Sequence, residues 1–180
     1  MKKGAGSSKG SAFERELCKR FSLWVSKGKR DDLYWRTAGS GARATTRGKR
    51  NLTTENSCGD MMCLSPEGKW LTDCFSFEFK RGYNTWNISE FLMCEENGLV
   101  KVWEKLNKEA STQDKIPILI FKQDRKDSFL FSFPSFFDKY KDIPILKGSS
   151  LIGEVWATKL YYIVPRLARI PRARKKAVEK

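Results

Sequence analysis

The segment Phe75–Arg81 (FSFEFKR) is the feature that most constrains how this chain can fold. Three phenylalanines alternate with a serine, a glutamate and a lysine. In an extended strand successive side chains point to opposite faces, so the aromatic rings share one face while Glu78 and Lys80 share the other. An all-phenylalanine face requires a hydrophobic core. The sequence therefore predicts a strand that is buried on one side and presents an acid and a base, side by side, on the other.

A helix is predicted over residues 12–26. Its apolar residues recur at helical spacing, with basic side chains between them. Ser11-Ala-Phe-Glu14 is a capping-box pattern, which on its own accounts for Glu14 as a capping partner. Residues 1–10, made largely of Gly, Ser and Lys, are expected to form a flexible basic arm.

The remaining patterns indicate one α/β (α+β) domain, and 180 residues are enough to bury a sizeable core. The expected elements are strands at 33–36 and 57–64, one or two strands over 70–79, short helices at 87–94 and 134–140, a helix at 98–110, and strands at 115–122, 128–133 and 156–164. Strands 59–64 and 74–80 are expected to pair antiparallel. That register permits Asp60 to lie near Glu78.

Charge is the strongest global feature, with a net charge of +14 and a pI of about 9.7. Such a charge favours a polyanionic partner, with nucleic acid ahead of an anionic membrane. Residues 37–50 interleave small and basic side chains, which suits a loop that approaches phosphates; a merely solvated loop is the open alternative. No apolar run reaches spanning length, so no membrane association and a soluble, cytoplasmic protein are expected.

Histidine is absent, which removes the usual catalytic triads and histidine-based metal sites. The chain has five cysteines, an odd number whose spacing forms no compact disulfide framework. This is typical of a reduced intracellular protein. Their spacings match no zinc module. We therefore expect small, buried thiols at Cys18, Cys58, Cys63, Cys74 and Cys94.

Two short motifs carry the candidate chemistry, and each is weak alone. Glu78-Phe79-Lys80 can be an ordinary exposed pair on a strand, and Gly59-Asp60 can be a turn signal. Together they supply two carboxylates and an ammonium group. This set can hold a divalent cation and direct a water molecule at a phosphate.

The order of these motifs along the chain resembles that of the PD-(D/E)xK nuclease superfamily and, within it, of the archaeal-type Holliday junction resolvases. The resemblance covers residues 9–133 and is carried by KGSAFEREL at 9–17, RTAGSG at 36–41, Gly59-Asp60 and FEFK at 77–80. It departs from the family at Gly59, where Pro or Val is expected, and at an insert over 82–97. It implies a restriction-endonuclease-like core, a central mixed β-sheet flanked by helices, within a nuclease domain at 11–165.

This resemblance also implies roles for individual residues. Asp60 and Glu78 bind one or two Mg²⁺ ions, with Mn²⁺ as an expected substitute, and the Phe79 carbonyl is a further ligand. Glu14 completes the site through a water molecule or as a ligand. Lys80 orients the attacking water or stabilises charge on phosphorus. The candidate DNA-binding residues are Arg36, Ser40, Arg43 and Arg47.

The implied partner is branched double-stranded DNA, cut by a homodimer in recombination, repair or the processing of viral DNA by a virus-encoded enzyme. Two alternatives stay open. One is another PD-(D/E)xK nuclease, of nicking, flap or restriction type. The other is a non-catalytic DNA-binding protein that uses only its basic ends, including the tail at 166–180.

Overall fold

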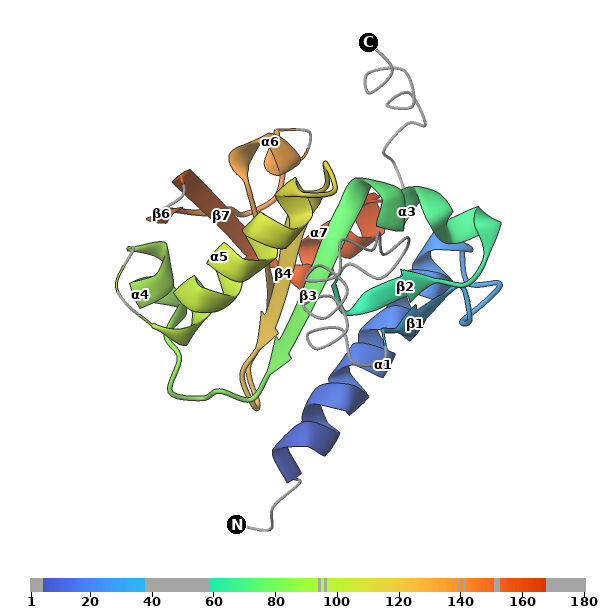
Figure 1. Ribbon diagram of the computed structural model, residues 1–180, viewed down its shortest axis with the longest axis horizontal. Helices are drawn as coiled ribbons and strands as arrows, with labels where there is room; N and C mark the ends of the chain where they lie inside the picture. The colour runs from blue at the N-terminus through green and yellow to red at the C-terminus, as the bar shows by residue number, and fades with distance from the viewer. Residues whose placement is uncertain are drawn as a thin grey trace.

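The computed structural model describes residues 5–37, 59–93, 95, 97–138, 140, 142–150 and 153–167. Its elements are α1 (Ala5–Val25), β1 (Tyr34–Arg36), β2 (Met61–Cys63), the 3₁₀ turn η1 (Pro66–Gly68), α3 (Lys69–Cys74), β3 (Phe75–Arg81), α4 (Ile88–Leu92), α5 (Gly98–Ser111), β4 (Ile116–Lys122), β5 (Ser128–Ser132), α6 (Pro134–Phe137), β6 (Leu146–Ser150), β7 (Gly153–Lys159) and α7 (Leu160–Leu167). Figure 1 shows their arrangement, with α5 across one face of the sheet and α7 on the other.

A five-stranded mixed sheet, in the order β3-β4-β5-β7-β6, forms the centre of the molecule. Strands β3 and β4 are parallel, with Phe77 opposite Ile118. The chain between them passes through α4 and α5, as a parallel connection requires. The other neighbouring pairs are antiparallel. This is the α+β, restriction-endonuclease-like architecture expected, a mixed sheet flanked by helices.

The two faces of the sheet are covered by separate hydrophobic clusters. The phenylalanines of β3 pack against α1, where Phe21 and Phe77 have ring centroids 5.2 Å apart. The opposite face packs against α5, whose Trp103 is fully buried. The alternation predicted for β3 is thereby confirmed, and Glu78 and Lys80 lie on the α5 side.

The helix α1 begins earlier than the sequence indicated, at Ala5 instead of residue 12. Ser11 lies inside the helix, so the capping-box prediction is wrong, and residues 5–10 of the expected flexible arm are helical. A contact distant in sequence accompanies this extension: Lys9 Nζ lies 3.2 Å from Asp124 Oδ2, beyond β4. Local propensity is a weak guide where such contacts act.

The prediction of a strand over 70–74 is wrong, because these residues belong to helix α3. The turn at Pro66–Gly68 leads directly into the helix, and Lys69 and Asp73 form an i,i+4 ion pair. The predicted antiparallel pairing with β3 is also wrong. β2 pairs antiparallel with β1, and its entry contacts β3 through a parallel bridge between Gly59 and Phe77.

The C-terminal strand prediction is half right. Residues 156–159 lie in β7, but residues 160–164 are the start of α7, where Leu160 and Ile163 join the α1-side core. The edge strand β6 was not predicted, because its sequence LKGSS lacks β-forming residues. Within the described part of the chain, no helix is long and apolar enough to cross a membrane.

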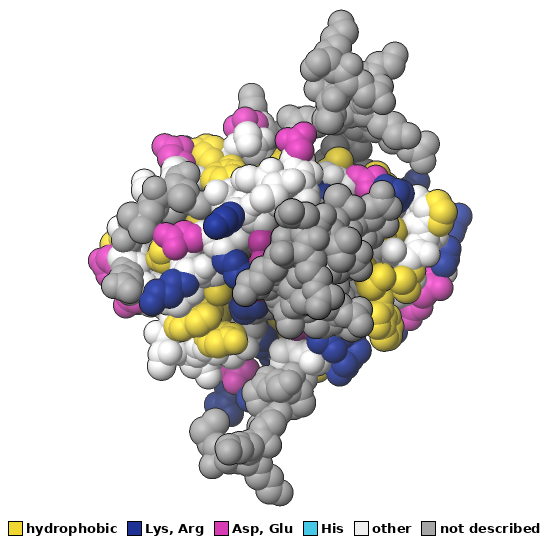
Figure 2. Space-filling model, in the orientation of Figure 1, with side chains coloured by type: hydrophobic (Ala, Val, Ile, Leu, Met, Phe, Trp, Pro, Cys, Tyr) yellow, Lys and Arg dark blue, Asp and Glu magenta, His cyan; other side chains and the backbone are white. Residues whose placement is uncertain are grey.

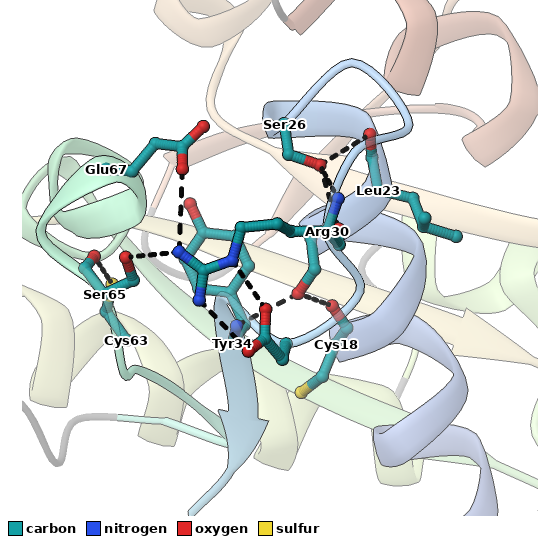
Figure 3. Close-up of polar contacts among 10 residues, drawn as sticks. Cys18, Leu23, Ser26, Arg30, Tyr34, Cys63, Ser65 and Glu67 are labelled. Carbon is teal, nitrogen blue, oxygen red and sulfur yellow. Dashed lines mark hydrogen bonds and ion pairs between the residues drawn. The ribbon is translucent and has the colours of Figure 1, made fainter.

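Serine and arginine side chains fix the link between α1 and the β1–β2 pair. The buried Ser22 hydroxyl accepts the Tyr34 N–H at 3.0 Å. The Ser26 hydroxyl accepts the Arg30 N–H at 2.8 Å, and the Arg30 guanidinium donates to Ser65 at 3.2 Å (Figure 3). Of these bonds, the one from Arg30 to Ser65 joins residues on the two sides of the undescribed 38–58 segment. The Ser22–Tyr34 bond holds the start of β1 in a defined position relative to α1.

Candidate active site

A polar cavity of about 200 Å³ lies beside β3. Its lining comes from α1, from the entry to β2, from β3 and from α5, and consists of Glu14, Gly59, Asp60, Glu78, Lys80, Lys105 and Glu109. The four residues expected to be catalytic, Glu14, Asp60, Glu78 and Lys80, are therefore brought together. The sequence separates them by up to 66 positions (80 minus 14), so only the folded chain assembles them.

Asp60 is fixed against β3 by main-chain bonds. Its N–H donates to the Phe77 carbonyl at 2.6 Å, and its carboxylate Oδ2 accepts the Phe79 N–H at 2.8 Å. The side chain is buried, with 6% exposed. Asp60 thus bonds to the main chain at this edge of β3 as a neighbouring strand would, and the backbone of β3 sets the position of the carboxylate.

Gly59 makes this approach possible. Its φ is +79°, and a Cβ there would lie 2.2 Å from the Phe77 carbonyl oxygen. We expect Gly59→Ala to destabilise the fold by about 1–3 kcal/mol and to displace Asp60, because the strain of positive φ adds to a backbone clash. Denaturant unfolding and nuclease assays would measure both effects. Gly28→Ala is the matched control: its φ is +82° with nothing within 4 Å, so it should cost stability alone. Equal effects of the two variants on cleavage would contradict this role of Gly59.

Glu78 and Lys80 form an ion pair inside the cavity. Burial raises the pKa of Glu78, and the charge of Asp60 raises it further, against the lowering effect of Lys80. Burial by itself lowers the pKa of Lys80, but the carboxylates of Glu78 and Asp60 outweigh it and the net shift is upward. Lys80 is therefore held as an ammonium group, which can donate hydrogen bonds but is unsuited to act as a general base.

Glu14 makes a direct contact with Arg36. Its Oε2 accepts from Arg36 Nε at 2.7 Å, across from α1 to the end of β1. The Glu14 side chain is 17% exposed and that of Arg36 is 30% exposed. Since α1 starts at Ala5, capping does not explain Glu14. Of the other expected DNA-binding residues, Ser40, Arg43 and Arg47 lie outside the described residues.

Two residues of the cavity were not predicted from the sequence, Lys105 and Glu109. They lie one turn apart on α5, with Lys105 Nζ 3.7 Å from a Glu109 carboxylate oxygen. The charge of Lys105 also lowers the pKa of Glu78. Their i,i+4 spacing on the polar face of an amphipathic helix is an available signal, but it does not say which strand edge that face meets.

The donor set fits a hard divalent cation. Asp60 and Glu78 offer carboxylate oxygens to the cavity. The N–H and carbonyl of one residue point to the same edge of a strand, so the bond from the Phe79 N–H to Asp60 implies that the Phe79 carbonyl faces this edge as well. Among the described residues no group of three or more Asp, Glu, Cys or His side chains is arranged to hold a metal. Two carboxylates with main-chain oxygen and water suffice for Mg²⁺. A cation would also relieve the repulsion between the two carboxylates that raises the pKa of Glu78.

Comparison with known proteins relates the chain to a family of nucleases. A family model described as "phage putative PDDEXK endonuclease" matches residues 5–154, which include every residue lining the cavity. No curated protein and no solved structure matches the chain. Divalent metals are typical of PD-(D/E)xK nucleases. The family match spans most of the sequence, and the chain belongs to the phage PDDEXK endonuclease family.

Proposed function

We propose that this endonuclease is a Mg²⁺-dependent, structure-specific enzyme that resolves four-way DNA junctions by paired nicking. The observation that carries the proposal is the convergence of Asp60, Glu78 and Lys80 on one polar cavity. The preference for junctions is supported by the motifs shared with archaeal-type Holliday junction resolvases, and by the net charge of +14. A basic chain whose described residues include no evident base-reading element suits recognition of DNA shape.

The proposed chemistry assigns a task to each residue. Asp60, Glu78 and the Phe79 carbonyl hold the cation, with Mn²⁺ as a substitute for Mg²⁺. A bound cation supplies Lewis-acid polarisation of the scissile phosphodiester and lowers the pKa of the attacking water. Lys80 keeps its proton beside two carboxylates, so it orients that water or stabilises the charge that builds on phosphorus.

Glu14 and Arg36 are proposed to act as a pair. Glu14 orients the guanidinium at 2.7 Å, and the remaining N–H groups of Arg36 stay available for a phosphate of the DNA backbone. Ser40, Arg43 and Arg47 are proposed to extend this contact along the strand. Glu14 also borders the cavity, so it can complete the metal site through a water molecule.

Paired nicking requires two sites related by a two-fold axis, so we propose that the active form is a homodimer. Each protomer then cuts one of two opposed strands. Recombination, repair and the trimming of branched viral DNA are the roles open to such an enzyme, and the family's phage association favours the last.

The decisive experiment compares a labelled immobile four-way junction with a flap and a linear duplex, in Mg²⁺, Mn²⁺ or EDTA. We expect symmetric paired nicks in the junction, at a rate at least about tenfold above the other substrates, and none in EDTA. Equal cutting of the flap or duplex would assign a different nuclease specificity. Binding without cutting in either metal would favour the non-catalytic alternative. Sedimentation of the complex would show whether two protomers bind one junction.

A further inference from the structure

An aromatic column stands on the sheet next to Lys80. The register of β3 and β4 pairs Lys80 with Phe121, so the two side chains share a face of the sheet. Trp86 stacks on Phe121 with centroids 6.1 Å apart and planes 29° apart. Tyr83 stacks on Trp86 at 4.0 Å and 16°. The column therefore runs from a buried ring to Tyr83, which is 49% exposed.

The loop after β3 is built to hold this column. Gly82 and Tyr83 both have positive φ, of +92° and +40°. The Gln123 side-chain amide donates to the Trp86 carbonyl at 2.8 Å. Gly98 leaves room for the indole, since a Cβ there would lie 2.1 Å from it. A left-handed backbone is costly for tyrosine, and here the ring is only half-buried, with one face against Trp86.

Tyr83 lies close to the candidate active site along the chain. It follows Lys80 by three residues, so chain length alone keeps the two Cα atoms within about 11 Å. On the face shown in Figure 2, hydrophobic side chains gather near the loop after β3, with Lys and Arg side chains beside them. A flat ring and cations together suit a nucleic acid strand.

We propose that the exposed face of Tyr83 is a stacking platform for an unpaired nucleobase next to the scissile phosphate. Trp86 covers one face of the ring, and a base would continue the column on the other. Bases inside a duplex already have both faces stacked, so the platform selects DNA with an unpaired or terminal base at the cut. The inference rests on the proposed function and specifies its substrate: a junction with an unpaired base at its branch point, in preference to intact duplex.

The test uses a four-way junction with one unpaired 2-aminopurine at the branch point, bound by full-length protein carrying Asp60→Asn to prevent cutting. We expect binding to quench the fluorescence. Adding Tyr83→Ala should abolish the quenching and weaken binding about 5- to 150-fold, the range for loss of one base–aromatic stack. Tyr83→Phe should keep both. Tyr83→Leu should behave as Tyr83→Ala, which separates a planar ring from mere bulk.

Tyr161→Ala is the matched control, because Tyr161 is an exposed tyrosine on α7, on the other side of the sheet, and its ring lies tilted against that of Tyr162. It should leave quenching and affinity unchanged. Full quenching and affinity with Tyr83→Ala or Tyr83→Leu in folded protein would overturn the platform. If the wild type cuts branched DNA in that case, only the platform is rejected. If the wild type neither binds nor cuts DNA, the proposed function and the platform both fail.

Discussion

Asp60→Asn should abolish DNA cleavage, lowering the rate by about 10³-fold or more, while the protein stays folded. The reason lies in the two tasks of this carboxylate. In the wild type, Asp60 Oδ2 accepts the Phe79 N–H at 2.8 Å. The side-chain oxygen of asparagine can accept the same N–H, so the contact with β3 is kept. The negative charge that the cation needs is lost. Removing that charge should also lower the pKa of Glu78, because Asp60 is one of the two causes that raise it.

Cleavage under single-turnover conditions, thermal unfolding and junction binding in EDTA would together check this prediction. Asp73→Asn is the matched control, since Asp73 is an aspartate on α3 whose ion pair with Lys69 lies outside the cavity. It should cleave within about a factor of two of the wild type, because exposed helix ion pairs contribute little. A rate near wild type for Asp60→Asn would remove the basis of the active-site assignment.

The parts of the fold that could be predicted are those set by local pattern. The alternating Phe75–Lys80 segment and the amphipathic 98–110 segment each bury one face, and the structure gives β3 and α5 there. The pairing between strands was not predictable in the same way. The turn at 66–69 suggested a hairpin, but residues 69–74 add a helix, so the entry to β2 meets β3 in parallel. A few residues between two strands thus decide their relative direction.

The candidate site shows the same division. Asp60, Glu78 and Lys80 could be predicted because their motifs lie on, or directly before, strands whose side-chain direction follows from alternation. Lys105 could not, since its place depends on how α5 packs across the sheet. The Glu14–Arg36 contact depends on the end of β1 meeting α1, which the hydroxyl of Ser22 and other side chains determine at a distance in sequence.

Lys80→Ala should lower the cleavage rate by about 10²- to 10³-fold and leave junction binding nearly intact. The ammonium group is partly buried, keeps its proton and pairs with Glu78 at the cavity, so its largest contribution is expected where charge builds on the phosphate. Metal affinity should not fall, because removal of a neighbouring cation leaves Asp60 and Glu78 freer to bind one. Lys80→Arg should restore little activity, since a planar fork does not replace a compact point charge.

Lys108→Ala provides the control for charge alone. Lys108 is exposed on α5 and is not among the residues that line the cavity. Its replacement by alanine removes the same unit of positive charge as Lys80→Ala. Both variants should show a similar small loss of DNA affinity that shrinks as salt rises, whereas only Lys80→Ala should slow the bond-breaking step. Single-turnover rates at saturating enzyme, measured across Mg²⁺ concentrations, separate the two effects. If excess Mg²⁺ restores Lys80→Ala to the wild-type rate, the lysine assists metal binding and has no direct part in phosphate chemistry.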